Sequence, residues 1–478
     1  MSKRKLEMEA RLNEALPRRL PGFRVLRSWS RLSGGASQEV YRLDVDLAEG
    51  PASIAMRRSA GGMWHDEALP GRAGTDTEAL LTRLAKEAGV PEPQVLGELE
   101  REDELGQGFF MEWLEGETLG SRIVKSDAFA AVRPRLAREC GEILARIHAI
   151  DVKATGLDQK LTRLDPKAFV EQTWGAYKFL KIPQPMIDYA GRWLLDNVPD
   201  DPTLGLVHSD FRNGNLMVSD AGITAVLDWE LAHIGDPMRD LGWICTNSWR
   251  FGRSDLPVGG FGTYDDLFAG YESVSGVPVD PDRVHFWEVF GSFWWAVGCL
   301  GMGSGFREGP DPSIERAAVG RRSSECQVDC VNLLIPGPVE VLEPVAQMPN
   351  LDLPRVDELV TGVRDFLRGD VMEGTEGRVR FMARVASNAL DIVARDLVVG
   401  ERHRSEEHKR LRDLLACDDT LEALRWQLVE ALRDDKPLPV DAEGLAHHLR
   451  TTVINQIAID QPRYSGFLTS ISDTHQPS

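Results

Sequence analysis

The sequence predicts an α+β protein with a small β-rich N-terminal part, a mainly helical middle part and an all-α helical bundle at the C-terminal end. Short β-like runs and one helix are expected within residues 1–115, and helical periodicity dominates residues 116–335. A proline-rich linker at 336–354 precedes residues 355–478, where the pattern is helical throughout. Since 478 residues are too many for one hydrophobic core, we expect several domains with these boundaries.

The N-terminal part begins with residues that favour a small sheet. Its β-like runs cover residues 23–26, 39–45 and 53–57. Between the first two runs lie Gly34, Gly35 and Ser37, and glycines at a hairpin tip allow positive φ and let backbone N–H groups approach a phosphate. Taken alone, a glycine pair is better explained by an ordinary β-turn. These residues are therefore nucleotide-binding candidates only together with the motif at 208–215 described below.

The next expected element is a helix at residues 75–84. Thr75 or Asp76 is its predicted N-cap, and leucines lie along one face. Glu78 falls in the first turn, where a carboxylate interacts favourably with the helix dipole. This placement alone explains why an acidic residue stands there.

The character of the chain changes at residues 109–116. Apolar β-prone residues that end in Glu-Gly are typical of a hinge between two lobes, and the backbone around Glu112 and Leu114 would be free to hydrogen-bond the edge of an adenine. Helical patterning follows over 133–150 and, with a break at two prolines, over 169–198.

The most informative motif lies between three predicted short strands at 204–207, 216–218 and 223–227. The intervening loop, residues 208–215, reads His-Ser-Asp-Phe-Arg-Asn-Gly-Asn and matches the H-x-D-x-x-x-x-N pattern of kinases. Phosphoryl transfer needs a carboxylate for the proton of the acceptor hydroxyl, for which Asp210 is the candidate. It also needs oxygen ligands for Mg²⁺, which Asn215 and Asp228 would supply. A chance match is a real risk for one motif, but the strand–loop–strand–turn–strand context favours a kinase-type site.

Further side chains are expected to belong to the same site. His208 and Arg212 lie in the loop itself and are candidate catalytic residues. In a kinase-like arrangement, Glu78 would also pair with a cationic side chain on the preceding strand that holds the nucleotide phosphates. That strand offers Arg57 and Arg58, and we favour Arg57 because it directly follows an apolar run.

The C-terminal part carries apolar stripes at helical spacing and no catalytic constellation. The stripes consist of Val356, Leu359, Val363, Phe366 and Leu367; of Val379, Met382, Ala386, Ala389, Val393 and Leu397; and of Leu421, Leu424, Leu428 and Leu432. His447 and His448 are adjacent, so their side chains diverge on a helix and do not favour a metal site. We therefore expect a small helical bundle without chemistry of its own.

The composition excludes several classes of function. A net charge of −20 disfavours binding to nucleic acid or an anionic membrane. The six cysteines are scattered without C-x-x-C pairs, which argues against zinc and against a disulfide framework. The charged start of the chain does not look like a signal peptide. The most apolar stretch, 284–302, is interrupted by His285 and Glu288 and contains several glycines, which favours a buried helix over a membrane span. We expect a cytoplasmic protein.

Together these motifs resemble the aminoglycoside phosphotransferase family of the protein-kinase-like superfamily over roughly residues 20–330. The resemblance runs through 32–37, 56–58, Glu78, 110–116, 208–215, 226–230 and 235–241. It implies a two-lobed protein-kinase-like fold with a β-rich N-lobe and a helical C-lobe. It also implies ATP, or in some members GTP, as phosphate donor, Mg²⁺ as metal and a small-molecule alcohol as substrate. It further implies Asp210 as catalytic base, Asn215 and Asp228 as metal ligands, and His208 and Asp240 as supports of the loop.

One departure narrows the resemblance to a branch of the family. Members commonly place Lys on the third strand, whereas this chain has Arg57 and Arg58, as in the kinase domains fused to or encoded beside acyl-CoA dehydrogenases. That branch implies a hydroxyacyl-CoA as acceptor, and residues 380–390 look like a helical domain of unknown function found beside such kinases. An aminoglycoside acceptor and a catalytically inactive nucleotide-binding scaffold stay open as alternatives. The oligomeric state is open as well, and the bundle is a candidate for self-association or for contact with a dehydrogenase.

Overall fold

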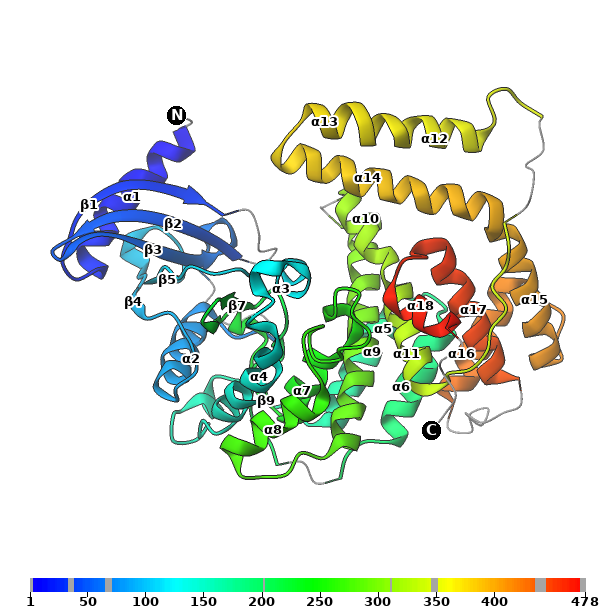
Figure 1. Cartoon of the computed structure of the whole chain (residues 1–478), viewed down its shortest axis with the longest axis horizontal. Coiled ribbons are helices and arrows are strands. Elements are labelled where there is room, and N and C mark those ends of the chain that lie inside the picture. The colour runs from blue at the N-terminus through cyan, green and yellow to red at the C-terminus, as the bar shows by residue number, and fades with distance from the viewer. Residues whose placement is uncertain are drawn as a thin grey trace.

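The computed structural model describes residues 3–32, 38–64, 71–200, 203–309, 312–344, 351–434 and 444–472. The predicted loop residues Gly34, Gly35 and Ser37 lie outside the described residues. The rest forms a lobe built on a sheet, a helical lobe and a group of C-terminal helices, which follow one another from left to right in Figure 1.

The N-terminal lobe contains a five-stranded sheet in the order β1-β2-β3-β5-β4, in which every neighbouring pair is antiparallel. Its strands are β1 (Phe23–Arg31), β2 (Gln38–Leu47), β3 (Gly50–Ser59), β4 (Val95–Glu98) and β5 (Gly108–Glu112). Side chains of β2 alternate between buried and half-buried, so that Tyr41, Leu43 and Val45 all face the core. The expected sheet is therefore present, with longer strands than the sequence pattern indicated.

Two helices accompany the sheet, and one of them was not expected. Helix α1 (Lys3–Arg19) buries Leu12 and Leu16 against the sheet, since these leucines recur at helical spacing within an otherwise charged segment. Helix α2 (Thr75–Glu87) is the predicted helix, but its N-cap is Gly74 and no side chain caps it. The prediction of Thr75 or Asp76 as N-cap was wrong because the backbone already turns helical at Thr75, whose side chain is buried.

The helical lobe contains most of the long helices and two short β-pairs. Its helices are α3 (Gly120–Lys125), α4 (Arg133–His148), α5 (Pro166–Phe179), α6 (Pro185–Asp196), α7 (Met238–Cys245), α8 (Tyr264–Ser275), α9 (Pro281–Glu308), α10 (Ile314–Arg321) and α11 (Ser323–Leu334). Strand β6 (Gly205–Val207) pairs with β9 (His233–Gly235), and β7 (Leu216–Ser219) pairs with β8 (Gly222–Val226). The three strands predicted around the 208–215 loop are thus present. The spacing of the sequence did not indicate that the first of them, β6, pairs with β9.

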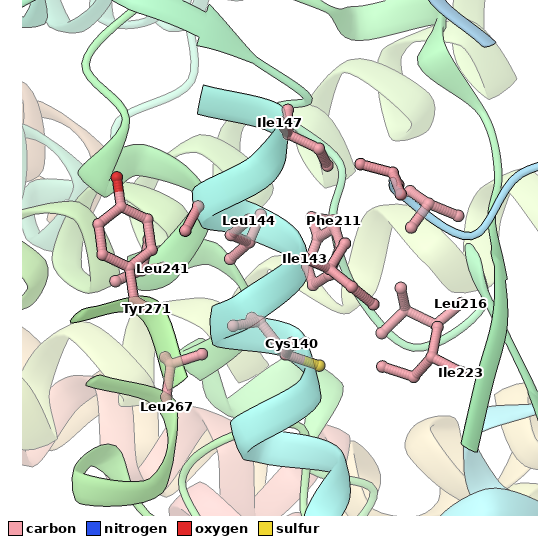
Figure 2. Close-up of a cluster of buried hydrophobic side chains, with 14 of the residues drawn as sticks. Cys140, Ile143, Leu144, Ile147, Phe211, Leu216, Ile223, Leu241, Leu267 and Tyr271 are labelled. Carbon is pink, nitrogen blue, oxygen red and sulfur yellow. The ribbon is translucent and has the colours of Figure 1, made fainter. Parts of the chain in front are cut away.

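Helix α4 is the centre of the core beneath the 208–215 loop. Figure 2 shows its buried side chains, such as Ile143 and Leu144, between two groups of residues. Phe211 and the β7–β8 residues lie on one side, and Leu267 and Tyr271 from α8 lie on the other. Because Phe211 is fully buried, the loop is anchored to the core by its own side chain.

The C-terminal helices share a core with the helical lobe. They are α12 (Val356–Phe366), α13 (Met372–Gly374), α14 (Gly377–Arg395), α15 (Glu401–Leu415), α16 (Leu421–Arg433), α17 (Leu445–Asp460) and α18 (Ser465–Ile471). One hydrophobic cluster includes Leu424 and Leu428 of α16 together with Phe290 of α9 and Val328 of α11. The four-part division of the chain by residue number stays a prediction.

The three predicted apolar stripes differ in burial. Leu424, Leu428 and Leu432 of the third are fully buried, whereas Val356 and Phe366 of the first are 58% and 56% exposed. Helix α12 lies over α14 at the edge of the molecule (Figure 1), and it packs mainly on α14 and on residues 367–371. The first stripe is therefore not part of a closed bundle core. None of the helices in the described ranges combines the length and apolar character needed to cross a membrane.

Candidate active site

The backbone of the 208–215 loop is held by one buried carboxylate. The N–H groups of His208 and Ser209 donate to the two oxygens of Asp240 at 2.9 and 2.7 Å, and His148 Nε2 lies 3.0 Å from the same side chain. Burial would raise the pKa of Asp240, but His148 and His208 outweigh it and the pKa is lowered. An ionised Asp240 at the start of α7 therefore fixes the point where β6 enters the loop.

His208 lies inside the loop instead of facing the solvent. Its Nδ1 accepts a hydrogen bond of 3.2 Å from the backbone N–H of Asp210, and its Nε2 lies 3.2 Å from the carbonyl oxygen of Leu227. Burial lowers its pKa, against the opposing effect of nearby carboxylates. A neutral imidazole thus links the loop to the strand end that carries Asp228.

The carboxylate of Asp210 is oriented by three donors. Trp243 Nε1 and Arg212 Nε each donate to Oδ1 at 2.9 Å, and Asn215 Nδ2 donates to Oδ2 at 2.5 Å. The guanidinium of Arg212 also lies over the ring of Trp249, at 4.3 Å from its centre. Asp210 is therefore held in one orientation within a largely buried setting, with 8% of its surface exposed.

Asn215 and Asp228 are brought together by the β-pair that follows the loop. The N–H of Leu227 donates to the carbonyl oxygen of Asn215 at 2.8 Å, and Asp228 is the next residue, with a left-handed φ of 72°. Because the Asn215 amide uses its N–H groups on Asp210, its side-chain oxygen remains the group that can bind a cation. An amide oxygen and a carboxylate are hard ligands of the type that Mg²⁺ prefers.

Arg57 links the sheet to this cluster. Its Nη2 lies 2.9 Å from Glu78 and 2.5 Å from Asp228, while its buried Nε has no hydrogen-bond partner in the described part of the chain. Arg58 points the other way and pairs with Glu39 at 2.7 Å, since successive residues of β3 face opposite sides of the sheet. Arg57 is therefore the arginine that reaches Glu78.

Burial and charge act against each other in this ion pair. Burial raises the pKa of Glu78 to about 7, although Arg57 and Gln38 oppose the rise. The pKa of Asp228 is lowered instead, because Arg57 outweighs the effect of burial at this less enclosed carboxylate. The pair supplies a fixed cation beside two candidate metal ligands, and such a donor set fits Mg²⁺ with the phosphates of a nucleotide.

The predicted hinge residues lie on the connection between the lobes. Glu112 ends β5, and its backbone N–H donates to the carbonyl oxygen of Gln94 at 2.8 Å. Leu114 follows in an extended, half-buried stretch that leads into α3. Their contact with an adenine stays a prediction.

Two side chains near the loop were missed or misjudged from the sequence. Trp243 is buried and donates to Asp210. Arg239 was not singled out at all; it is fully buried among the rings of Trp243, Trp294 and other aromatic residues. Burial lowers its pKa to about 10. No sequence pattern distinguishes a buried arginine of this kind from a solvated one in the first turn of a helix.

A cavity of about 240 Å³ opens beside the loop. It is lined by Ser209, by Phe169 and Trp294, and by the exposed cations Arg72 and Lys160. Arg72 pairs with Glu230 at 2.9 Å and Lys160 with Asp76 at 3.1 Å, both with side chains about two-fifths exposed. Trp294 and Phe169 thus give this cavity an aromatic side.

The two lobes with this loop between them define a protein-kinase-like fold. A Ralstonia eutropha protein provisionally named an aminoglycoside phosphotransferase has the same architecture, with a TM-score of 0.53 and 22% identity over 68% of this chain and 97% of that one. The predicted fold class is confirmed. The chain belongs to the phosphotransferase enzyme family, whose model matches residues 28–277.

Further matches agree with the predicted branch. A domain of unknown function, DUF6285, matches residues 373–464. The mouse acyl-CoA dehydrogenase family member 10 is 29% identical over 243 residues, which are 47% of this chain and 22% of that protein. The rat family member 11 is 28% identical over 244 residues, 49% of this chain and 30% of that protein. This chain therefore spans less than a third of the length of these relatives, and the resemblance predicted from the motifs is confirmed.

Proposed function

We propose that the chain transfers the terminal phosphate of ATP to a hydroxyl group of a small molecule, with Mg²⁺ as metal. The observation that carries the proposal is the meeting of Asp210, Asn215 and Arg57 with Asp228 at the junction of the lobes. Family membership supports the reaction class. A catalytic carboxylate, hard oxygen ligands and a fixed cation are the groups that phosphoryl transfer requires.

Each residue has a distinct part in the proposed reaction. Asp210, held by its three donors, orients the acceptor hydroxyl and accepts its proton. Asn215 and Asp228 would hold Mg²⁺, which when bound neutralises phosphate charge. Arg57 would contact the phosphates through its Nε, which has no hydrogen-bond partner among the described residues, while its Nη2 pairs with Glu78 and Asp228. Arg212 holds Asp210 in place.

The nucleotide contacts are proposed from the sequence pattern and the position of the hinge. Gly34, Gly35 and Ser37 would cover the phosphates with backbone N–H groups. The backbone at Glu112 and Leu114 would bind the base. The assay below compares GTP with ATP as the phosphate donor.

For the acceptor we propose a hydroxyacyl-CoA. The match to acyl-CoA dehydrogenase family members supports it. Arg72 and Lys160 beside Ser209 are paired with Glu230 and Asp76, so the charge of this cavity does not favour either acceptor. The aminoglycoside is therefore the competing acceptor in the test.

The test compares Asp210→Asn with the natural chain, using γ-labelled ATP or GTP with a hydroxyacyl-CoA or kanamycin as acceptor. We expect labelled hydroxyacyl-CoA, and at least a 100-fold loss of turnover in Asp210→Asn at unchanged ATP affinity. Asp220→Asn is the matched control, because Asp220 is exposed in the β7–β8 turn. Full turnover in Asp210→Asn would reject the base, labelling of kanamycin alone would reject the acceptor, and ATP binding without any product would favour an inactive scaffold.

A further inference from the structure

A second and larger cavity lies between the helical lobe and the C-terminal helices. Its volume is about 620 Å³, within the range of roughly 300–1,000 Å³ that small-molecule sites occupy. Residues of the α5–α6 connection, α9, α10 and α11 line one side, and residues of α15, α16 and α17 line the other. None of the residues of the candidate active site belongs to its lining.

Two ion pairs neutralise most of the charge within this cavity. Arg425 on α16 binds both oxygens of Glu407 on α15, at 2.7 and 2.5 Å, and Glu407 is fully buried. Arg321 on α10 binds Asp460 on α17 at 2.8 Å. The Arg321–Asp460 pair connects the two walls of the cavity, whereas the Arg425–Glu407 pair lies within one wall.

His448 provides a polar atom that no described residue satisfies. It lines the cavity with 2% of its surface exposed, and its Nδ1 has no hydrogen-bond partner within the described ranges. Burial lowers its pKa to about 4, so the imidazole is neutral and can donate or accept one hydrogen bond. A buried polar atom of this kind is normally bonded to water or to a ligand.

The remaining lining combines apolar and uncharged polar side chains with a small surplus of positive charge. Leu300, Phe306 and Val453 contribute hydrocarbon surface. Lys181 and Arg307 are exposed on the lining and make no ion pair among the described residues, whereas Glu308 contributes one carboxylate. Two cations against one anion favour a negatively charged ligand.

We propose that this cavity binds a small organic anion with an apolar body, separately from phosphoryl transfer. The oxyanion contacts Lys181 or Arg307, the hydrocarbon part packs on the apolar wall, and His448 satisfies a polar atom of the ligand. Because both the helical lobe and the C-terminal helices line the site, the ligand also stabilises their contact. A carboxylate and a phosphate ester share this chemistry, and the test distinguishes them.

The test uses calorimetric titration of the full chain with octanoate, octyl phosphate, octan-1-ol and inorganic phosphate. We expect one of the two amphiphilic anions to bind with a stoichiometry of one and to raise the melting temperature. Octan-1-ol lacks the charge and inorganic phosphate lacks the apolar body, so neither should bind. Failure of both anions, or equal binding of octan-1-ol, would overturn the proposal.

Two variants locate the binding. The double variant Lys181→Glu with Arg307→Glu changes exposed residues that do not support the core, and it should lower the affinity for the anion at least tenfold. Ser304→Trp fills the cavity from α9 and should abolish binding. Lys153→Glu is the control, since Lys153 is exposed and lines none of this cavity. Unchanged affinity in the double variant, or an equal loss in the control, would refute the site.

Discussion

The Arg57–Glu78 pair makes stability depend on pH in a direction that can be calculated. Glu78 has a pKa of about 7 in the folded chain and an ordinary value of 4.5. The folded state therefore binds this proton more tightly than the unfolded state does. The resulting stabilisation is fully present below pH 4.5 and is lost as the pH rises through about 7. Replacing Glu78 by Gln removes this dependence, because an amide does not titrate.

The magnitude follows from the same pKa values. One pKa unit is worth about 1.4 kcal/mol, so a rise from 4.5 to about 7 corresponds to roughly 3 kcal/mol. Equilibrium urea unfolding at pH 5, 6, 7 and 8 measures the free energy of unfolding of both chains. Between pH 5 and pH 8, the free energy of unfolding of Glu78→Gln should rise relative to that of the natural chain by most of this difference.

A control on the same helix separates the ion pair from the loss of any carboxylate. Glu87→Gln removes an exposed carboxylate near the end of α2 and should follow the pH dependence of the natural chain. If the free energies of unfolding of Glu78→Gln and the natural chain change in parallel across this pH range, folded Glu78 does not bind its proton more tightly than unfolded Glu78. The ion-paired Glu78 would also make turnover rise with pH through about 7, a rise that Glu78→Gln should lack.

Three further substitutions test the site and its support. Trp243→Phe removes one donor to Asp210, worth about 1.4 kcal/mol, and should lower kcat about tenfold at unchanged KM for ATP. Gly141→Ala would place a Cβ 2.1 Å from a backbone oxygen of α8, so calorimetry should show a loss of about 2 kcal/mol. Asp188→Ala leaves the cation of Arg433 without its buried partner on α6, and urea unfolding should show a loss of about 3 kcal/mol. An unchanged kcat in Trp243→Phe, or an unchanged free energy of unfolding in either of the other two variants, would contradict the contact that the substitution tests.

Local patterns in the chain were sufficient for the fold class and for the identity of the loop. The alternation in β2, the helical spacing in α4 and the motif at 208–215 are all short-range signals, because each depends on residues a few positions apart. The preference for Arg57 over Arg58 as partner of Glu78 also agrees with the structure. Their roles in phosphate binding stay predictions.

Other features could not be read from short-range patterns. Helix α1 was missed because its charged residues hide the two leucines that the sheet buries. The exposed stripe on α12 and the buried leucines on α16 have the same spacing, and only the neighbouring helices make them different.

The sequence by itself determined the reaction class that we propose for this protein, since a carboxylate, an amide and a second carboxylate at set spacing can serve few reactions. Tertiary structure alone decided that Trp243 donates to Asp210 and that Arg57 pairs with Asp228. It also decided that α15–α17 close a cavity against the helical lobe. Such contacts join residues far apart in the chain, and their energies depend on burial and distance, which no local pattern encodes.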